Sequence, residues 1–73
     1  MDWKKYITVN QDICHGKACI KGTRIMVSII LDNIANNITT EEILKSYPTI
    51  DKISIRACVA YAAALANDRV INF

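Results

Sequence analysis

The stretch ITTEEILKSYPTID, residues 38–51, holds the start of one helix, its end and the start of the next. Thr39 and Glu42 have the spacing of a capping box, and the isoleucines around them have that of a hydrophobic staple. Pro48 excludes the residue before it from helical geometry, so this helix must be short. We expect its core-facing side chains to be Ile43, Leu44 and Tyr47.

A longer helix follows, with Asp51 as a suitable N-cap, and is expected to run to about Asn67. Its apolar residues recur at helical spacing in two adjacent stripes, so it should be buried on more than one side. The first stripe comprises Ile55, Cys58, Val59, Ala62, Leu65 and Ala66, and the second comprises Ile53, Ala57, Ala60, Tyr61 and Ala64. Two short preceding helices cannot cover both stripes. We therefore expect a second copy of the chain on the second stripe; the alternative is that the N-terminal strands cover it.

Upstream, another helix is predicted from Ser28, a plausible N-cap, to Asn37, which tolerates the left-handed conformation that ends helices. Its apolar face comprises Val27, Ile30, Leu31, Ile34 and Ala35. Residues 6–27 contain strand formers and read as extended, with Gly16 and Gly22 where the chain must reverse. The last two short extended pieces should flank a turn at Lys21-Gly22.

These elements predict one domain over residues 1–73, mainly α in class. A short hairpin-like β element within an extended segment, 1–27, precedes a three-helix unit of helix-turn-helix type, 28–67, and a C-terminal tail, 68–73. Hydrophobic residues make up 52% of the chain, slightly above the roughly 45–50% that is usual. This excess favours burial in an oligomer or a complex.

Location follows from three features of the sequence. The N-terminus lacks the apolar stretch of a signal peptide, and the longest apolar run, 57–66, is too short to span a bilayer. Three cysteines at irregular spacing are a poor disulfide framework. We expect a cytoplasmic protein with reduced thiols and no membrane contact.

The net charge of +2 is unevenly distributed. Residues 1–27 hold five cations against two acids, or +3, whereas residues 28–73 hold four cations against five acids, or −1. A basic N-terminal third is able to touch phosphates, although the charge alone favours an ordinary solvated surface.

Three soft metal ligands, Cys14, His15 and Cys19, lie near one another in the sequence. Their spacing is not that of zinc pairs, and the fourth ligand would have to be Cys58, from a helix. Cys14 and His15 are adjacent, which rarely places a nucleophile and a base face to face, and the acids are scattered. We expect that the protein is not an enzyme and has no catalytic residue, metal ligand or cofactor. A metal or thiol site at Cys14, His15 and Cys19 is the weakest alternative.

A helix-turn-helix reads DNA with the N-terminal residues of its second helix. The base-reading candidates here are Lys52, Ser54 and Arg56, and the phosphate-contacting candidates are Lys17, Lys21 and Arg24. These base-reading candidates are few, and the helix that carries them is largely apolar. The alternative is a packing unit whose last helix serves association with other proteins.

Three segments, 13–28, 39–48 and 55–63, resemble in this order the motifs of the family named domain of unknown function 433. The resemblance covers about residues 7–64. It implies a homeodomain-like three-helix fold with a short N-terminal β element. It also implies the role of an antitoxin that pairs with a PIN-like nuclease toxin, forms a dimer and binds its own operator DNA. The alternative function is a protein–protein interaction module that does not bind DNA.

The chain departs from the family at several positions. Members usually carry glycine at His15, proline at Ala18 and glycine at Asn37, and often proline at Gln11. The first two departures weaken a metal site. The family's Gly22-Thr23-Arg24 run is kept: a threonine hydroxyl can hold a turn, and Arg24 is expected to brace the fold through backbone carbonyls or, alternatively, to face a partner.

Overall fold

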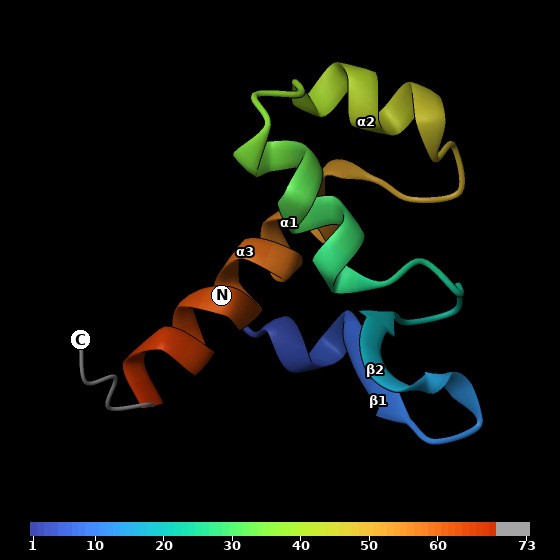
Figure 1. Cartoon of the computed structure of the whole chain (residues 1–73), viewed down its shortest axis with the longest axis vertical. Coiled ribbons are helices and arrows are strands. Elements are labelled where there is room, and N and C mark those ends of the chain that lie inside the picture. Colours follow the sequence, from blue (N-terminus) through green and yellow to red (C-terminus); the bar gives the residue numbers. More distant parts are fainter. Residues whose placement is uncertain (69–73) are drawn as a thin grey trace.

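The computed structural model describes residues 1–68, in which a β-hairpin precedes three helices (Figure 1). Its elements are η1 (Trp3–Lys5), β1 (Ile7–Asn10), β2 (Ile13–Ile20), α1 (Val27–Ala35), α2 (Thr40–Ser46) and α3 (Lys52–Asp68). The predicted class, mainly α with an N-terminal hairpin, is confirmed. Asp68 belongs to α3, and the rest of the expected tail lies outside the described residues. Within residues 1–68 no helix is long and apolar enough to cross a membrane.

The second strand of the hairpin contains a large bulge. β1 and β2 are antiparallel, and Val9 pairs with Ala18 while the next residue, Asn10, pairs with Ile13. The four residues between these partners, 14–17, therefore loop out of the ladder. Cys14, His15 and Gly16 all have positive φ, at 53°, 55° and 81°. Gly16 thus serves the bulge, not the chain reversal that we expected there.

The chain reverses twice around β2. The hairpin turn is at residues 11–12. The predicted turn at Lys21-Gly22 follows β2, with Gly22 at φ 81°, and leads to a bridge between Cys19 and Met26. Thr23 holds this turn as expected, because its hydroxyl donates to the Ile20 carbonyl at 2.7 Å and accepts from the N–H of Ile25 at 3.0 Å.

The start of α1 differs from the prediction. Met26, extended at ψ 141°, is the N-cap and makes no side-chain capping bond, so Ser28 lies inside the helix. The bridge to Cys19 fixes Met26 in that extended conformation, and Val27 is the first residue free to turn. The end of α1 agrees with the sequence, because Asn37 is left-handed at φ 63°.

The Thr39 cap before α2, its exit at Pro48 and the Asp51 cap of α3 are confirmed. The Thr39 side chain accepts a hydrogen bond from the N–H of Glu42 at 3.2 Å. Tyr47 leaves helical geometry at φ −129° and ψ 73°, directly before Pro48. Asp51 caps α3, since its Oδ1 accepts from both the N–H and the hydroxyl of Ser54 at 2.9 Å.

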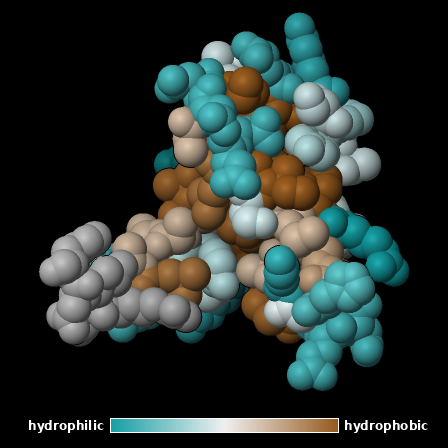
Figure 2. Space-filling view, in the orientation of Figure 1, coloured by the Kyte–Doolittle hydropathy of each residue, from teal (hydrophilic) through white to brown (hydrophobic). Residues whose placement is uncertain are grey.

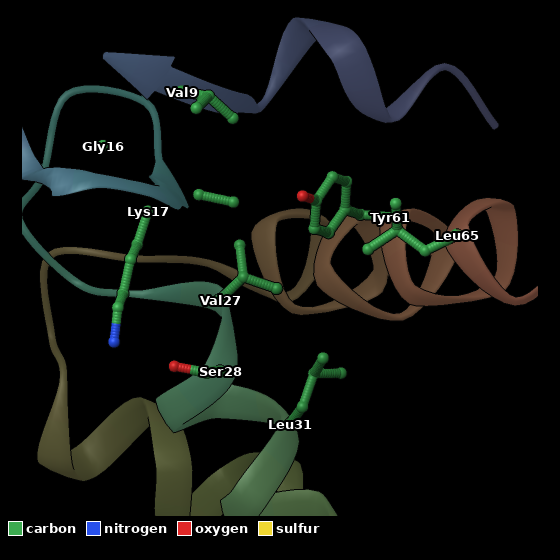
Figure 3. A pocket seen from close by; sticks show the side chains of 9 residues that line it. Val9, Gly16, Lys17, Val27, Ser28, Leu31, Tyr61 and Leu65 are labelled. Carbon is green, nitrogen blue, oxygen red and sulfur yellow. The ribbon is translucent and has the colours of Figure 1, made fainter. Parts of the chain in front are cut away.

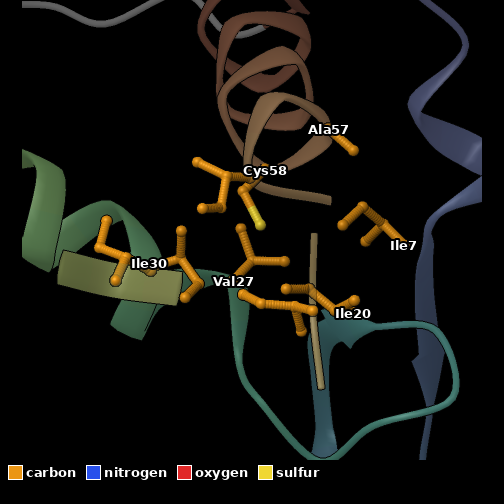
Figure 4. Close-up of a cluster of buried hydrophobic side chains, with 9 residues drawn as sticks. Ile7, Ile20, Val27, Ile30, Ala57 and Cys58 are labelled. Atoms are coloured by element: carbon orange, nitrogen blue, oxygen red, sulfur yellow. The ribbon is translucent and has the colours of Figure 1, made fainter. Parts of the chain in front are cut away.

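The hydrophobic core lies where the hairpin, the three helices and the loop before α3 meet (Figure 4). Trp3, Tyr6, Leu44 and Tyr47 pack around it. Its buried residues are Ile7, Ile20, Val27, Ile30, Ile43, Ile50, Ile55, Ala57 and Cys58. The last fully buried residue of α3 is Cys58, the seventh of its 17 residues, and Tyr61 packs against the core from the next turn. The end of α3 therefore extends past the core, away from α2 (Figure 1).

Candidate binding surface

The N-terminal segment covers part of the second stripe of α3. The Trp3 and Tyr61 rings pack edge to face, with centroids 4.9 Å apart and planes at 73°. Ala57 has no exposed surface, so it is a core residue and cannot contact a partner. Ala60 and Ala64 are half-buried, and Ile53 remains 46% exposed. The alternative that we kept open was coverage by the N-terminal strands; the residue that packs on Tyr61, Trp3, belongs instead to η1, directly before the strands.

Two apolar residues of the first stripe of α3 are exposed instead. Val59 is 48% and Leu65 39% exposed, although both were expected to face the core. α3 continues past Cys58, and the N-terminal segment packs against its Tyr61 side, so Val59 and Leu65 stay partly exposed. On α1, Ile34 is also 37% exposed, because it lies in the last turn, at the edge of the core.

Ile34 and Val59 line one groove, whereas Leu65 lines a different cavity. The groove lies between the end of α1, the start of α2 and the middle of α3, and has a volume of about 570 Å³. The residues of this α1–α3 groove are Met1, Ile34, Ile38, Thr39, Thr40, Ile55, Arg56, Val59, Ala60 and Ala63. Arg56 supplies the charged group. Figure 2 shows hydrophobic residues gathered across the middle of one face of the molecule, between hydrophilic ends.

A second cavity, of about 430 Å³, lies between the hairpin, the start of α1 and α3 (Figure 3). Its walls are mostly apolar, with Lys17 and Ser28 as polar members and Tyr61 on the α3 side. The bulge of β2 forms part of the wall through Gly16 and Lys17. We call this the hairpin cavity.

The DNA-binding candidates fall on two parts of the fold. Lys52 and Arg56 are exposed on the first turns of α3. Ser54 is buried and its hydroxyl donates to Asp51, so it cannot read a base. The other candidates, Lys17, Lys21 and Arg24, are exposed on β2 and the loop after it.

The Cys14 and Cys19 thiols meet the same loop. Cys14 Sγ donates to the Arg24 carbonyl at 3.3 Å, and Cys19 Sγ donates to the Thr23 carbonyl at 3.6 Å. Burial is the main reason that the pKa of Cys19 is raised; a hydrogen bond and the charge of Cys14 add to the rise, and Arg24 opposes it. The backbone carbonyl of Arg24 thus accepts a hydrogen bond from Cys14. The predicted role of its side chain, bracing the fold through backbone carbonyls, is not seen among the hydrogen bonds of residues 1–68.

His15 is exposed, and Cys58 points into the core from α3 (Figure 4). Burial raises the pKa of Cys58 to about 11. In the part of the chain that the structure describes, no three His, Cys, Asp or Glu side chains are grouped to hold a metal ion. The four potential ligands are therefore not brought together.

Sequence reasoning missed Ile34 and Val59 as surface residues. Their spacing is that of core residues; for Val59 the available signal was that α3 is longer than its neighbours.

The comparisons with known proteins agree with the resemblance to domain of unknown function 433. The model of a family described as "Protein of unknown function (DUF433)" matches residues 7–62. No curated protein and no solved structure gives a significant match.

Proposed function

Because this chain belongs to the DUF433 family of proteins of unknown function, we propose a function from its own surface: it is a small binding protein of the antitoxin type. The α1–α3 groove receives protein partners, namely a second copy of the chain and a PIN-like toxin. The second partner, a PIN-like toxin, is the one that the family resemblance implies. The observation that carries the proposal is the groove itself, apolar and open, with Ile34 37% and Val59 48% exposed.

The energetics favour a protein partner in this groove. Fully burying a valine or isoleucine side chain contributes roughly 1.5–3 kcal/mol. Val59 is about half exposed, so a partner that covers it gains on the order of 1 kcal/mol from this residue. Arg56 at the groove favours a partner that presents a carboxylate beside its apolar side chains.

Two substitutions on α3 test the proposal. Val59→Glu places a carboxylate in the groove, and Ile53→Glu places one on an equally exposed part of the same helix that does not line it. We expect Val59→Glu to reduce self-association in sedimentation experiments and co-purification with a PIN-like nuclease from a neighbouring gene. Ile53→Glu should leave both near wild type. If only Ile53→Glu disrupts binding, the partner surface is the second stripe and the groove proposal fails.

Operator binding is the second candidate function. It is supported by the exposed cations Lys52 and Arg56 at the start of α3 and by those of the hairpin region. Anisotropy titrations of the upstream DNA should show affinity that falls with salt, and Arg56→Gln should reduce the salt slope by about one unit if it contacts a phosphate. No binding at low salt would leave a protein-binding module without DNA contact.

A further inference from the structure

Cys14 and Cys19 form a thiol pair that the binding function does not use. Their sulfurs donate to the carbonyls of two consecutive residues, Arg24 and Thr23, which brings both thiols to the same short stretch of backbone. Cys14 is accordingly among the groups that raise the pKa of Cys19. The bulge produces this proximity: Cys14 belongs to the looped-out residues, and Cys19 follows directly after the ladder resumes at Ala18. An unbulged strand would carry side chains five residues apart on opposite faces.

The two thiols differ in access. Cys14 is half-buried and Cys19 has no exposed surface. An oxidant therefore reaches Cys14 before the fully buried Cys19. An accessible thiol beside a second, resolving thiol is one feature of redox-sensing cysteines.

Cys58 provides an internal contrast. It is fully buried in the core, and its pKa of about 11 is two units above the ordinary value of 9.0. Its thiolate fraction at neutral pH is therefore about 100-fold below that of an ordinary thiol. Oxidation at the pair should leave Cys58 unchanged.

We propose that Cys14 and Cys19 are a redox modification site, which a peroxide converts to a reversible intramolecular disulfide. The Cys14 thiolate attacks one peroxide oxygen; an S–O bond forms, the O–O bond breaks, and the leaving hydroxide takes a proton to become water. The Cys19 sulfur then attacks Cys14 sulfur; the S–S bond forms, the S–O bond breaks, and the hydroxyl leaves with the Cys19 proton as a second water. The two sulfurs together lose two electrons, and the peroxide gains them.

The disulfide acts on the bulge. It ends the two thiol hydrogen bonds to the 23–24 carbonyls and ties Cys14 to the ladder. The residues between the bonded cysteines include Gly16, Lys17 and Ala18, which line the hairpin cavity. Oxidation therefore reshapes this cavity and leaves the α1–α3 groove, on other elements, unchanged.

The test uses the full reduced chain. The folded protein is treated with hydrogen peroxide, denatured and alkylated, and its intact mass is measured. We expect the loss of two hydrogens and alkylation of one thiol in place of the three free cysteines of the reduced chain. Trypsin cuts after Lys17, between the two cysteines. The disulfide should therefore join peptides 6–17 and 18–21 until a reductant separates them.

Two serine variants complete the test. Cys14→Ser should abolish the two-hydrogen loss, and Cys19→Ser should stop at a sulfenic acid on Cys14 that dimedone traps. Peptide mapping of the wild-type chain decides the matter even if a variant fails to fold. A disulfide that includes Cys58, one that joins two chains, or oxidation of Cys14 without the two-hydrogen loss would overturn the proposal.

Discussion

Ile29 and Ile30, neighbours in the first turn of α1, allow the described core to be tested with a matched pair. Ile30 has no exposed surface, whereas Ile29 is 37% exposed. Both substitutions to alanine gain a few tenths of a kcal/mol of helix propensity, and this gain cancels in the comparison. Ile30→Ala should lower the free energy of unfolding by about 2–5 kcal/mol, because it removes buried methyl groups and leaves a cavity.

The Ile29→Ala variant should lose much less, about 1 kcal/mol, since part of its side chain is in water in both states. For a chain of this length the total stability is roughly 4–11 kcal/mol, so Ile30→Ala removes a large share of it. The expected difference between the variants, about 2 kcal/mol, corresponds to roughly 8–16 °C in Tm.

Circular dichroism melts at low protein concentration give both values. The milder pair Ile30→Val and Ile29→Val, with about 0.5–1.5 kcal/mol expected at the buried position, covers the case in which Ile30→Ala does not fold. Equal losses at the two positions would refute the placement of α1 against the core. A cost for Ile29→Ala that grows with protein concentration would instead place Ile29 in an interface between copies.

Substitutions at three further sites, Thr39, Asp51 and Asn37, test single features of the backbone. Thr39→Ala should cost about 1 kcal/mol through the lost cap, measured by urea unfolding, with Thr40→Ala as the nearby control. Hydrogen bonds from the Ser54 N–H and hydroxyl lower the pKa of Asp51 from 3.8; its stabilising effect is therefore present above that value and lost as the pH falls through the lower folded-state pKa. The Tm difference between wild type and Asp51→Asn should accordingly be greatest near neutral pH and shrink on acidification. Asn37→Ala should cost about 1 kcal/mol at a left-handed position, whereas Asn37→Gly should cost none, and equal unfolding midpoints for the two would contradict the assigned φ.

Local signals predicted the ends of the helices well. The Thr39 and Asp51 caps, the exit at Pro48 and the left-handed Asn37 depend on a few consecutive residues, and all four are observed. Ser28 was wrong as a cap for a non-local reason, because the pairing of Met26 with Cys19 decides where α1 begins. A capping preference of about 1 kcal/mol does not outweigh a strand pairing that also closes the core.

The binding surface was harder to predict. Helical spacing gives the face on which Val59 lies, but not the point along α3 at which neighbours end. The bulge of β2 is hidden for a similar reason: the shift from Val9 to Asn10 depends on both strands, and a cysteine such as Cys14 seldom takes positive φ. The proximity of Cys14 and Cys19 therefore became visible only with the fold.

The position of Met1 has a practical consequence. Met1 lines the α1–α3 groove, and the N-terminus lies over α3 (Figure 1). Any peptide fused to this end is tethered at the mouth of the groove, where a short flexible linker gives it an effective concentration in the millimolar range. Even a weakly apolar affinity tag would then compete with a partner protein. Binding experiments should use an untagged chain, or compare tags at both ends.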